Sequence, residues 1–134
     1  MNEVSSSLHD IFQALSDPYR IRMVCLMLRA KSEMCLCELS DSLEEPEYKL
    51  SRHLKVLKSS GIVNAERDGK WIYHSLAKNK YLKLIHEAIK SYPDPDGQRD
   101  RDFRRFKSRA KLRENGRCRQ TPKLEREINL RASM

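Results

Sequence analysis

Residues 33–61 constrain the fold of this chain more than any other stretch. They hold two short segments in which leucines recur at helical spacing, separated by a turn that contains Pro46. The first segment runs from Cys35 to Leu43 and the second from Glu47 to Ser60, and Gly61 is placed to end the second. Two helices joined by a short turn form a helix-turn-helix unit, whose second helix can enter the major groove of DNA.

The second of these helices has one apolar and one polar face. Leu50, Leu54 and Leu57 define the apolar face, which is expected to point into the core. At about 100° per residue, the remaining surface carries the residues that we expect to contact DNA, which are Tyr48, Lys49, Ser51, Arg52, Lys55 and Ser59. Arginine can donate two hydrogen bonds to guanine, serine can reach a base or a phosphate, and lysine neutralises phosphate. An ordinary amphipathic helix with a solvated polar face would show the same pattern.

The residues after Gly61 favour the DNA-binding interpretation. Two strand-like segments, 62–67 and 70–76, flank an Asp-Gly pair, which is typical of a tight hairpin because both turn residues must tolerate positive φ. Arg67 and Lys70 lie at the tip, where we expect them to contact DNA. A helix-turn-helix followed by a basic hairpin is a winged helix. The predicted fold class is therefore mainly α with a small β-hairpin.

Three further helices are expected to complete this domain, which we place at residues 1–92. Ser7 can cap the first, Asp17 and Pro18 open the second, and the last runs from Asn79 to Tyr92. Apolar residues cover more of the last helix than one side of a small domain can bury. We therefore expect a homodimer, packed through the first and last helices, that places two reading helices on a palindromic operator.

Residues 93–134 are expected to form a basic extension of the domain. They hold 13 Lys and Arg against 7 Asp and Glu, whereas residues 1–92 hold 14 against 12. A linker of Pro, Asp and Gly precedes an arginine-rich helical pattern over Arg99–Asn115, and Thr121 could cap a last short helix. The pattern leaves open whether the extension is disordered, docked on the domain or laid along DNA.

Composition narrows the class of partner. The 134 residues carry a formal net charge of +8, which favours a polyanion such as double-stranded DNA. There is no run of 18 apolar residues and no signal-like start, so we expect a cytoplasmic protein without membrane association. Four cysteines, two of them separated by one residue, indicate metal binding or redox chemistry rather than a secreted disulfide framework.

Several groups of residues, at matching spacings, carry a family resemblance. They are Ala14–Pro18 with Arg20–Arg22, Cys35–Leu39, Leu50–Leu57, and Gly61–Val63 with Asp68–Tyr73. Together they resemble the ArsR/SmtB metal-sensing repressors, and within that family the arsenical-resistance operon repressors. The resemblance covers about residues 8–90. It implies a winged-helix homodimer that binds its operator in the apo state and releases it when arsenite or antimonite binds.

The inducer requires soft ligands, and cysteine supplies them. Trivalent arsenic prefers three thiolates in a trigonal pyramid. Cys35 and Cys37 lie at the start of a helix, where free amides and the helix dipole should lower the pKa of a thiol. Residues i and i+2 point about 200° apart on a regular helix, so we expect the first turn to open when both bind one ion.

The family often has a third cysteine where this chain has Ser40. Cys118 is the better candidate for the third sulfur, because Cys25 lies on the core stripe of the second helix; a small thiol is the other source.

The same residues support other functions less well. A thiol-based redox-sensing repressor would need a strained disulfide between Cys35 and Cys37. An enzyme of thiol exchange would need a Cys-x-x-Cys motif, which the chain lacks, so we expect no enzyme. His86 stands alone on the last predicted helix, so the Asp/His set that binds zinc there in other family members is missing.

Overall fold

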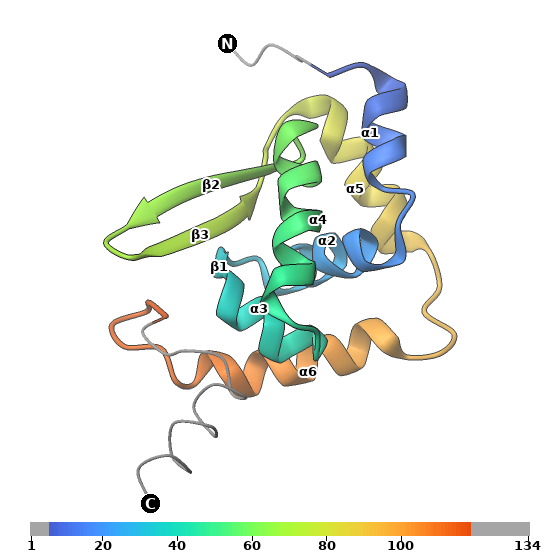
Figure 1. Cartoon of the computed structure of the whole chain (residues 1–134). Helices are drawn as coiled ribbons and strands as arrows, with labels where there is room; N and C mark the ends of the chain where they lie inside the picture. The colour runs from blue at the N-terminus through green and yellow to red at the C-terminus, as the bar shows by residue number, and fades with distance from the viewer. Residues whose placement is uncertain (1–5, 119–134) are drawn as a thin grey trace, which may run out of the picture.

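The computed structural model describes residues 6–118, which form a helical body with a small antiparallel sheet on one side (Figure 1). In chain order the elements are α1 (Leu8–Ala14), α2 (Pro18–Ala30), β1 (Met34–Cys35), α3 (Leu36–Leu43), α4 (Glu47–Ser59), β2 (Val63–Asp68), β3 (Trp71–Leu76), α5 (Lys80–Ser91) and α6 (Gln98–Ala110). Within the described residues, no helix is both long and apolar enough to cross a membrane.

Side-chain caps begin two of the helices where the sequence predicted a start. The Asp17 carboxylate accepts hydrogen bonds from the backbone N–H groups of Tyr19 at 2.8 Å and Arg20 at 3.3 Å. The Asn79 side chain caps α5 in the same way, accepting from the amides of Tyr81 and Leu82. Such caps satisfy amide groups that have no partner inside the helix. The predicted starts of α2 and α5 are confirmed to within a residue.

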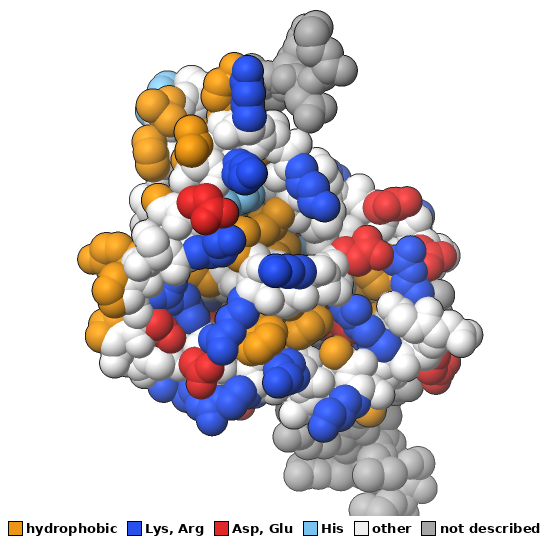
Figure 2. All heavy atoms as spheres, turned by 180° about the vertical axis from the view of Figure 1, so that it is seen from behind, with side chains coloured by type: hydrophobic (Ala, Val, Ile, Leu, Met, Phe, Trp, Pro, Cys, Tyr) orange, Lys and Arg blue, Asp and Glu red, His pale blue; other side chains and the backbone are white. Residues whose placement is uncertain are grey.

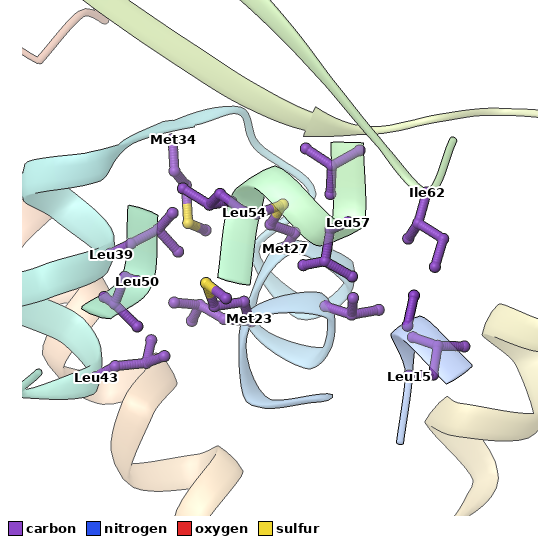
Figure 3. Close-up of a cluster of buried hydrophobic side chains, with 14 of the residues drawn as sticks. Leu15, Met23, Met27, Met34, Leu39, Leu43, Leu50, Leu54, Leu57 and Ile62 are labelled. Atoms are coloured by element: carbon purple, nitrogen blue, oxygen red, sulfur yellow. The ribbon is translucent and has the colours of Figure 1, made fainter. Parts of the chain in front are cut away.

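The core forms where the leucine faces of α3 and α4 meet α2. Figure 3 labels two leucines of α3 and three of α4 together with methionines of α2 and β1. These residues are almost fully buried: Met23, Met27, Met34, Leu39, Leu43, Leu50, Leu54 and Leu57. Gly61 follows α4 with a φ of +82°, a left-handed conformation that glycine adopts at little cost. The helix-turn-helix is therefore held rigidly on its apolar side, and its polar side is free to meet a partner.

The predicted hairpin is present and is extended by a third strand that the sequence did not reveal. Strands β2 and β3 pair antiparallel from Val63 opposite Leu76 to Asp68 opposite Trp71, and they project away from the helices (Figure 1). The sheet order is β1-β3-β2, with Cys35 of β1 opposite Tyr73 of β3. Two residues are too few to show an alternating pattern, which is why β1 was missed. Helix-turn-helix and hairpin together make a winged helix.

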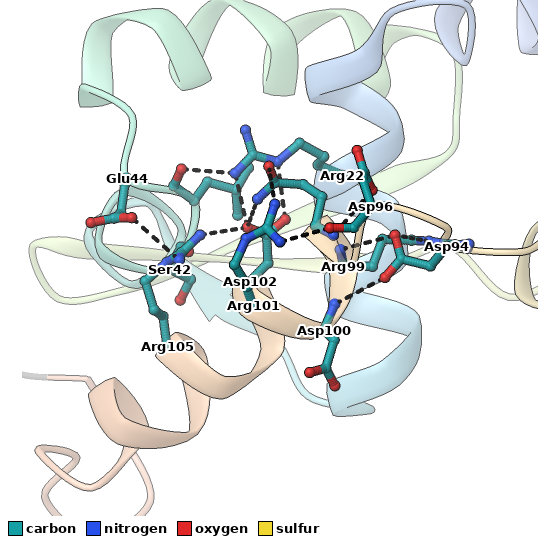
Figure 4. A network of polar contacts seen from close by, with 12 residues as sticks. Arg22, Ser42, Glu44, Asp94, Asp96, Arg99, Asp100, Arg101, Asp102 and Arg105 are labelled. Carbon is teal, nitrogen blue, oxygen red and sulfur yellow. Dashed lines mark hydrogen bonds and ion pairs between the residues drawn. The ribbon is translucent and has the colours of Figure 1, made fainter.

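The extension is docked on the domain as far as residue 118. Helix α6 runs across α2 and α3 (Figure 1), and its Phe106, only 5 % exposed, joins the main core. The buried carboxylate of Asp102 accepts two hydrogen bonds from Arg22 of α2, at 2.8 and 3.0 Å, and one from Arg105 (Figure 4). Helix α6 ends at Ala110, earlier than the expected Asn115. The short helix predicted from Thr121 lies outside the described residues.

Phe106 tests how much this docking stabilises the fold. We expect Phe106→Ala to lower the free energy of unfolding by about 3 kcal/mol, because it leaves a cavity in a core that α2 and α3 share. The matched control is Leu112→Ala, since Leu112 is 41 % exposed and its truncation should cost less than about 1 kcal/mol. Equilibrium urea unfolding of the full chain measures both. Equal, small losses would show that α6 lies on the domain without supporting it.

Candidate metal centre and DNA-binding face

Three of the four cysteines meet in one buried cluster. The sulfur atoms of Cys35, Cys37 and Cys118 all lie within 4.8 Å of one another, and those of Cys37 and Cys118 are 3.1 Å apart. The three residues are between 0 and 3 % exposed. Tyr73 is buried with them, and Trp71 packs against the cluster. Of the candidates for the third sulfur, the structure brings Cys118 to the site, whereas Cys25 lies on α2 beside Arg99.

The pair Cys35 and Cys37 converges without any opening of the helix, so that expectation was wrong. Cys35 precedes α3 as its N-cap residue and has an extended backbone, with φ −81° and ψ 163°. The angle of about 200° applies only between two residues that are both inside a helix. Because β1 ends where α3 begins, the chain turns between the two thiols. The Cys35 amide donates to Oε1 of Glu38 at 3.2 Å, which fixes this turn.

The extension reaches the cluster through a short turn after α6. Glu114 and Arg117 exchange two backbone hydrogen bonds, of 2.8 and 3.0 Å, and this closes the turn. The Tyr73 hydroxyl then donates to the carbonyl oxygen of Cys118 at 3.0 Å, and the Arg117 guanidinium lies 4.6 Å from the centre of the Tyr73 ring. The wing strand β3 therefore holds Cys118 in place from the other side of the cluster.

Two arginines tie the same turn to α3. The Glu38 carboxylate is fully buried and accepts from Nε of Arg113 at 2.6 Å and from its Nη2 at 2.9 Å. Arg109 pairs with Asp41 and donates from Nη2 to the Cys118 sulfur at 3.6 Å. A planar guanidinium matches a carboxylate with two parallel hydrogen bonds, so these contacts set position as well as charge.

The thiols of Cys35 and Cys37 are held in their protonated form. Hydrogen bonding with Cys118 and burial raise the pKa of Cys37 to about 12, although Cys35 and Arg109 act in the opposite direction. The pKa of Cys35 is raised by its hydrogen bonds to Cys118 and Cys37 and by burial. The expectation that the helix start would lower these pKa values was wrong. Sharing of protons among three crowded, buried sulfurs outweighs the dipole of one short helix.

The spacing of the sulfurs fits a single soft ion. Thiolates that bind one ion at about 2.3 Å, the usual zinc–sulfur distance, lie at most about 4.6 Å apart. The three sulfurs are already close to that limit, so small side-chain shifts would bring them into contact with one centre. Ser40 takes no part, because its hydroxyl donates to the Glu45 carbonyl at 2.6 Å and closes the turn between α3 and α4.

The polar face of α4 is open to solvent, as expected for a helix that reads DNA. Tyr48 is 70 % exposed, and the side chains of Ser51, Arg52, Lys55 and Ser59 are also exposed. Arg67 and Lys70 are exposed at the tip of the wing. These positions stay predicted DNA contacts.

Lys49 differs from the rest of the predicted set, and a further lysine of α4, Lys58, lies outside that set. Lys49 is half-buried: its ammonium lies 3.1 Å from Glu45 and 3.6 Å from the centre of the Tyr19 ring, so it is engaged within the domain. Lys58 is exposed on α4 and was missed by the sequence analysis. It lies three residues after Lys55, one turn along the same side of the helix, and this spacing was the signal that could have identified it.

A groove connects this face with the cysteine cluster. A cavity of about 620 Å³ opens between α4 and the wing, and we call it the α4–wing groove. Cys35 and Cys37 line it, together with Ser51, Lys55, Lys58, Lys70, Trp71 and His74. Burial and the nearby Lys58 lower the pKa of His74 to about 4, so its imidazole is neutral at physiological pH. Two of the predicted metal ligands therefore share one surface depression with the predicted DNA contacts Ser51, Lys55 and Lys70.

A second, apolar groove lies between α1, α2 and α5. It encloses about 960 Å³ and is lined by Phe12, Leu84 and Tyr92, which are 55, 74 and 74 % exposed. Seen from behind, hydrophobic side chains reach the surface in several patches among Lys and Arg (Figure 2). Exposed apolar area of this kind commonly marks a protein interface. This is the surface through which the sequence predicts dimerisation.

Comparisons with known proteins identify relatives that regulate transcription. The sequence model described as "Bacterial regulatory protein, arsR family" matches residues 17–65. The chain is 36 % identical over 95 residues to the arsenic resistance transcriptional regulator ArsR1 of Pseudomonas putida, covering 66 % of this chain and 73 % of that protein. It is 36 % identical over 81 residues to the arsenical resistance operon repressor of Escherichia coli, covering 58 % and 68 %.

A solved structure shares the fold. Reduced HlyU from Vibrio cholerae superposes with a TM-score of 0.57 at 25 % identity, covering 64 % of this chain and 88 % of that one. The relatives are transcriptional regulators rather than enzymes.

The DNA-binding face can be tested by two substitutions on exposed positions. We expect Arg52→Ala to weaken binding to promoter DNA by about 1–3 kcal/mol, and Lys55→Ala to lower the slope of log K against log salt by about one unit. Folding should be unchanged, since both side chains are solvent-exposed. Fluorescence anisotropy at several salt concentrations measures both effects, with Lys90→Ala on α5 as control. Unchanged affinity and slope in both variants would exclude α4 as the reading helix.

Proposed function

Because this chain belongs to the ArsR/SmtB family of bacterial transcriptional regulators, we propose that it is a repressor that senses trivalent arsenic or antimony. In this proposal the apo protein binds its operator as a homodimer, and it leaves the DNA when the metalloid binds Cys35, Cys37 and Cys118. The observation that carries the proposal is the buried cluster of three thiols within 4.8 Å.

The protonated state of Cys35 and Cys37 favours a metalloid hydroxide over a divalent cation. A cation such as Zn²⁺ needs deprotonated thiolates, so it would have to displace a proton from each cysteine. Arsenite, As(OH)₃, reacts with three thiols to give three arsenic–sulfur bonds and three water molecules, with no net release of protons. The raised pKa values of Cys35 and Cys37 therefore weaken cation binding much more than they weaken binding of the metalloid. Three soft sulfur donors also match the preference of trivalent arsenic.

The position of the cluster suggests how binding would be transmitted. One sulfur belongs to β1, one to the first turn of α3 and one to the extension, and β1 pairs with strand β3 of the wing. An ion held by all three would tie these segments together. Helix α3 supports α4 through shared core leucines, so a shift of α3 would move the reading helix relative to the wing. Release of DNA requires that the ion bind the DNA-free conformation more tightly than the DNA-bound one.

The homodimer of this proposal uses the apolar groove between α1, α2 and α5. The exposed Phe12, Leu84 and Tyr92 would be buried against a second copy, which removes their contact with water. A two-fold axis there repeats the same surface on both subunits and places two α4 helices on one face. An operator read by such a dimer would be palindromic.

A redox sensor is the second candidate function. Its disulfide would join Cys37 and Cys118 instead of Cys35 and Cys37. The sulfurs of Cys37 and Cys118 are 3.1 Å apart, and a structural neighbour is the reduced form of HlyU. A peroxide could convert these two thiols into a disulfide, with its two oxygens leaving as water. The Arg109 guanidinium beside Cys118 would favour the thiolate that begins such a reaction. A peroxide response that persists in Cys35→Ser would favour this candidate.

Serine variants test the sensor. We expect Cys35→Ser, Cys37→Ser and Cys118→Ser each to bind promoter DNA like the parent and to stay bound when arsenite is added, because a hydroxyl is a poor ligand for a soft ion. The control is Cys25→Ser, which lies outside the cluster and should keep the response even if it lowers stability. An electrophoretic mobility shift assay over a range of arsenite concentrations measures release. If the Cys35→Ser/Cys37→Ser double variant is released at the parent's arsenite concentration, the sensor proposal is wrong.

A further inference from the structure

We propose that the α4–wing groove is the docking site for an anionic thiol complex of the metalloid, which delivers the ion to the buried cysteines. This inference rests on the proposed function and names the chemical form of the inducer. The carrier would be a small thiol that also bears carboxylates. The groove would hold one of the thiol molecules bound to arsenic while the arsenic is transferred to the protein cysteines.

The first argument is access. The cluster cysteines expose at most 3 % of their surface, so a ligand can reach their sulfurs only where they border an opening. The α4–wing groove is such an opening, and both Cys35 and Cys37 line it. Its volume of about 620 Å³ lies within the range typical of small-molecule sites. A molecule of tripeptide size fits that space.

The second argument is charge. Three lysines, Lys55, Lys58 and Lys70, line the groove, against one acidic residue, Glu47. The three lysines are exposed, and none of them takes part in an ion pair seen among the described residues. They form a cationic rim around a floor of thiols. Carboxylates on the non-reacting part of the carrier would find complementary charge there, whereas a cationic thiol would be repelled.

The third argument is an unsatisfied polar atom. Within residues 6–118, Nδ1 of His74 is buried and has no hydrogen-bond partner. His74 lines the same groove. A buried polar atom without a partner costs stability, and a ligand that supplies the missing hydrogen bond recovers that cost. A peptide-like carrier has amide and carboxylate groups that could do so once the side chains that cover Nδ1 move aside.

The delivery step is a simple exchange of sulfur ligands. The Cys37 sulfur bonds to arsenic, a bond between arsenic and one carrier sulfur breaks, and the proton of the Cys37 thiol goes to the departing thiolate. Repetition at Cys35 and Cys118 completes the transfer and frees the carrier as thiols. Arsenic stays trivalent throughout, so the step needs no oxidant or reductant.

The same groove gives the order of events on DNA. Lys55 and Lys70 are also predicted DNA contacts, so bound DNA would cover the rim on which the carrier docks. DNA and the carrier complex then compete directly, in addition to any conformational coupling. Delivery should be fast to the free repressor and slow to the DNA-bound one.

Stopped-flow absorbance of arsenic–sulfur bond formation tests the docking site on the full chain. Arsenite is supplied either with glutathione, which carries carboxylates, or with cysteamine, which carries an amine. We expect transfer from the glutathione complex to be at least about tenfold faster, in the range of electrostatic steering. The advantage should disappear in Lys55→Gln/Lys58→Gln/Lys70→Gln and persist in the control Lys80→Gln/Lys83→Gln, whose lysines lie on α5. Saturating promoter DNA should slow the glutathione reaction of the parent.

Equal rates from the two carriers, or an advantage that survives in the triple variant, would overturn the docking site. Either result would leave the proposed function intact, because the metalloid would still reach the three sulfurs. Failure of the proposed function looks different: no arsenic–sulfur absorbance develops with either carrier, and this inference then fails with it.

Discussion

The structure depends on two buried carboxylates that receive arginines from across one interface. Asp102 of α6 is bound by Arg22 of α2, and Glu38 of α3 is bound by Arg113 of the extension. Both carboxylates are fully buried, and removing one partner of such a pair typically costs about 3–5 kcal/mol because the other charge is left without compensation. In one pair the domain supplies the arginine and the extension the carboxylate, and in the other pair these roles are reversed. A shift of the extension relative to the domain would therefore break both pairs. The position of Cys118 beside α3 is a consequence of this double attachment.

This attachment brings together the segments that are expected to read DNA and those that supply the three thiols. Helix α4 presents the residues expected to read DNA, β1 and α3 supply two thiols, and the extension supplies the third. Strand β3 connects them, because Tyr73 contacts Cys118 while its strand pairs with β1 and carries one side of the wing. A ligand that binds all three sulfurs would therefore link β1, α3 and the extension, and these segments contact α4 and strand β3 of the wing. The proposed switch needs no long pathway, since sensor and DNA-binding face share the α4–wing groove.

Sequence patterns predicted the elements well and the contacts between distant segments poorly. Leucine spacing, the Asp17 cap and the Asp-Gly turn located the helices and the wing, because each is a local signal. Strand β1 was too short to show a pattern, and its extended backbone is what invalidated the helical angle assumed between Cys35 and Cys37. The pKa values were predicted with the wrong sign, because the proximity of Cys118 cannot be read from a local motif. The docking of α6 was left open for a similar reason: its arginines look like a solvated face until Asp102 and Glu38 are seen to be buried.

The central claim is that one metalloid ion is held by three protein sulfurs, one of them from the extension. Arsenic K-edge X-ray absorption of the full chain, loaded with one equivalent of arsenite and freed of small thiols, tests it most directly. We expect three sulfur neighbours in the parent and two sulfurs with one oxygen in Cys118→Ser, because water or hydroxide would replace the missing thiolate. Two sulfurs and one oxygen in the parent as well would contradict the claim and show that Cys118 is a neighbour of the site rather than a ligand.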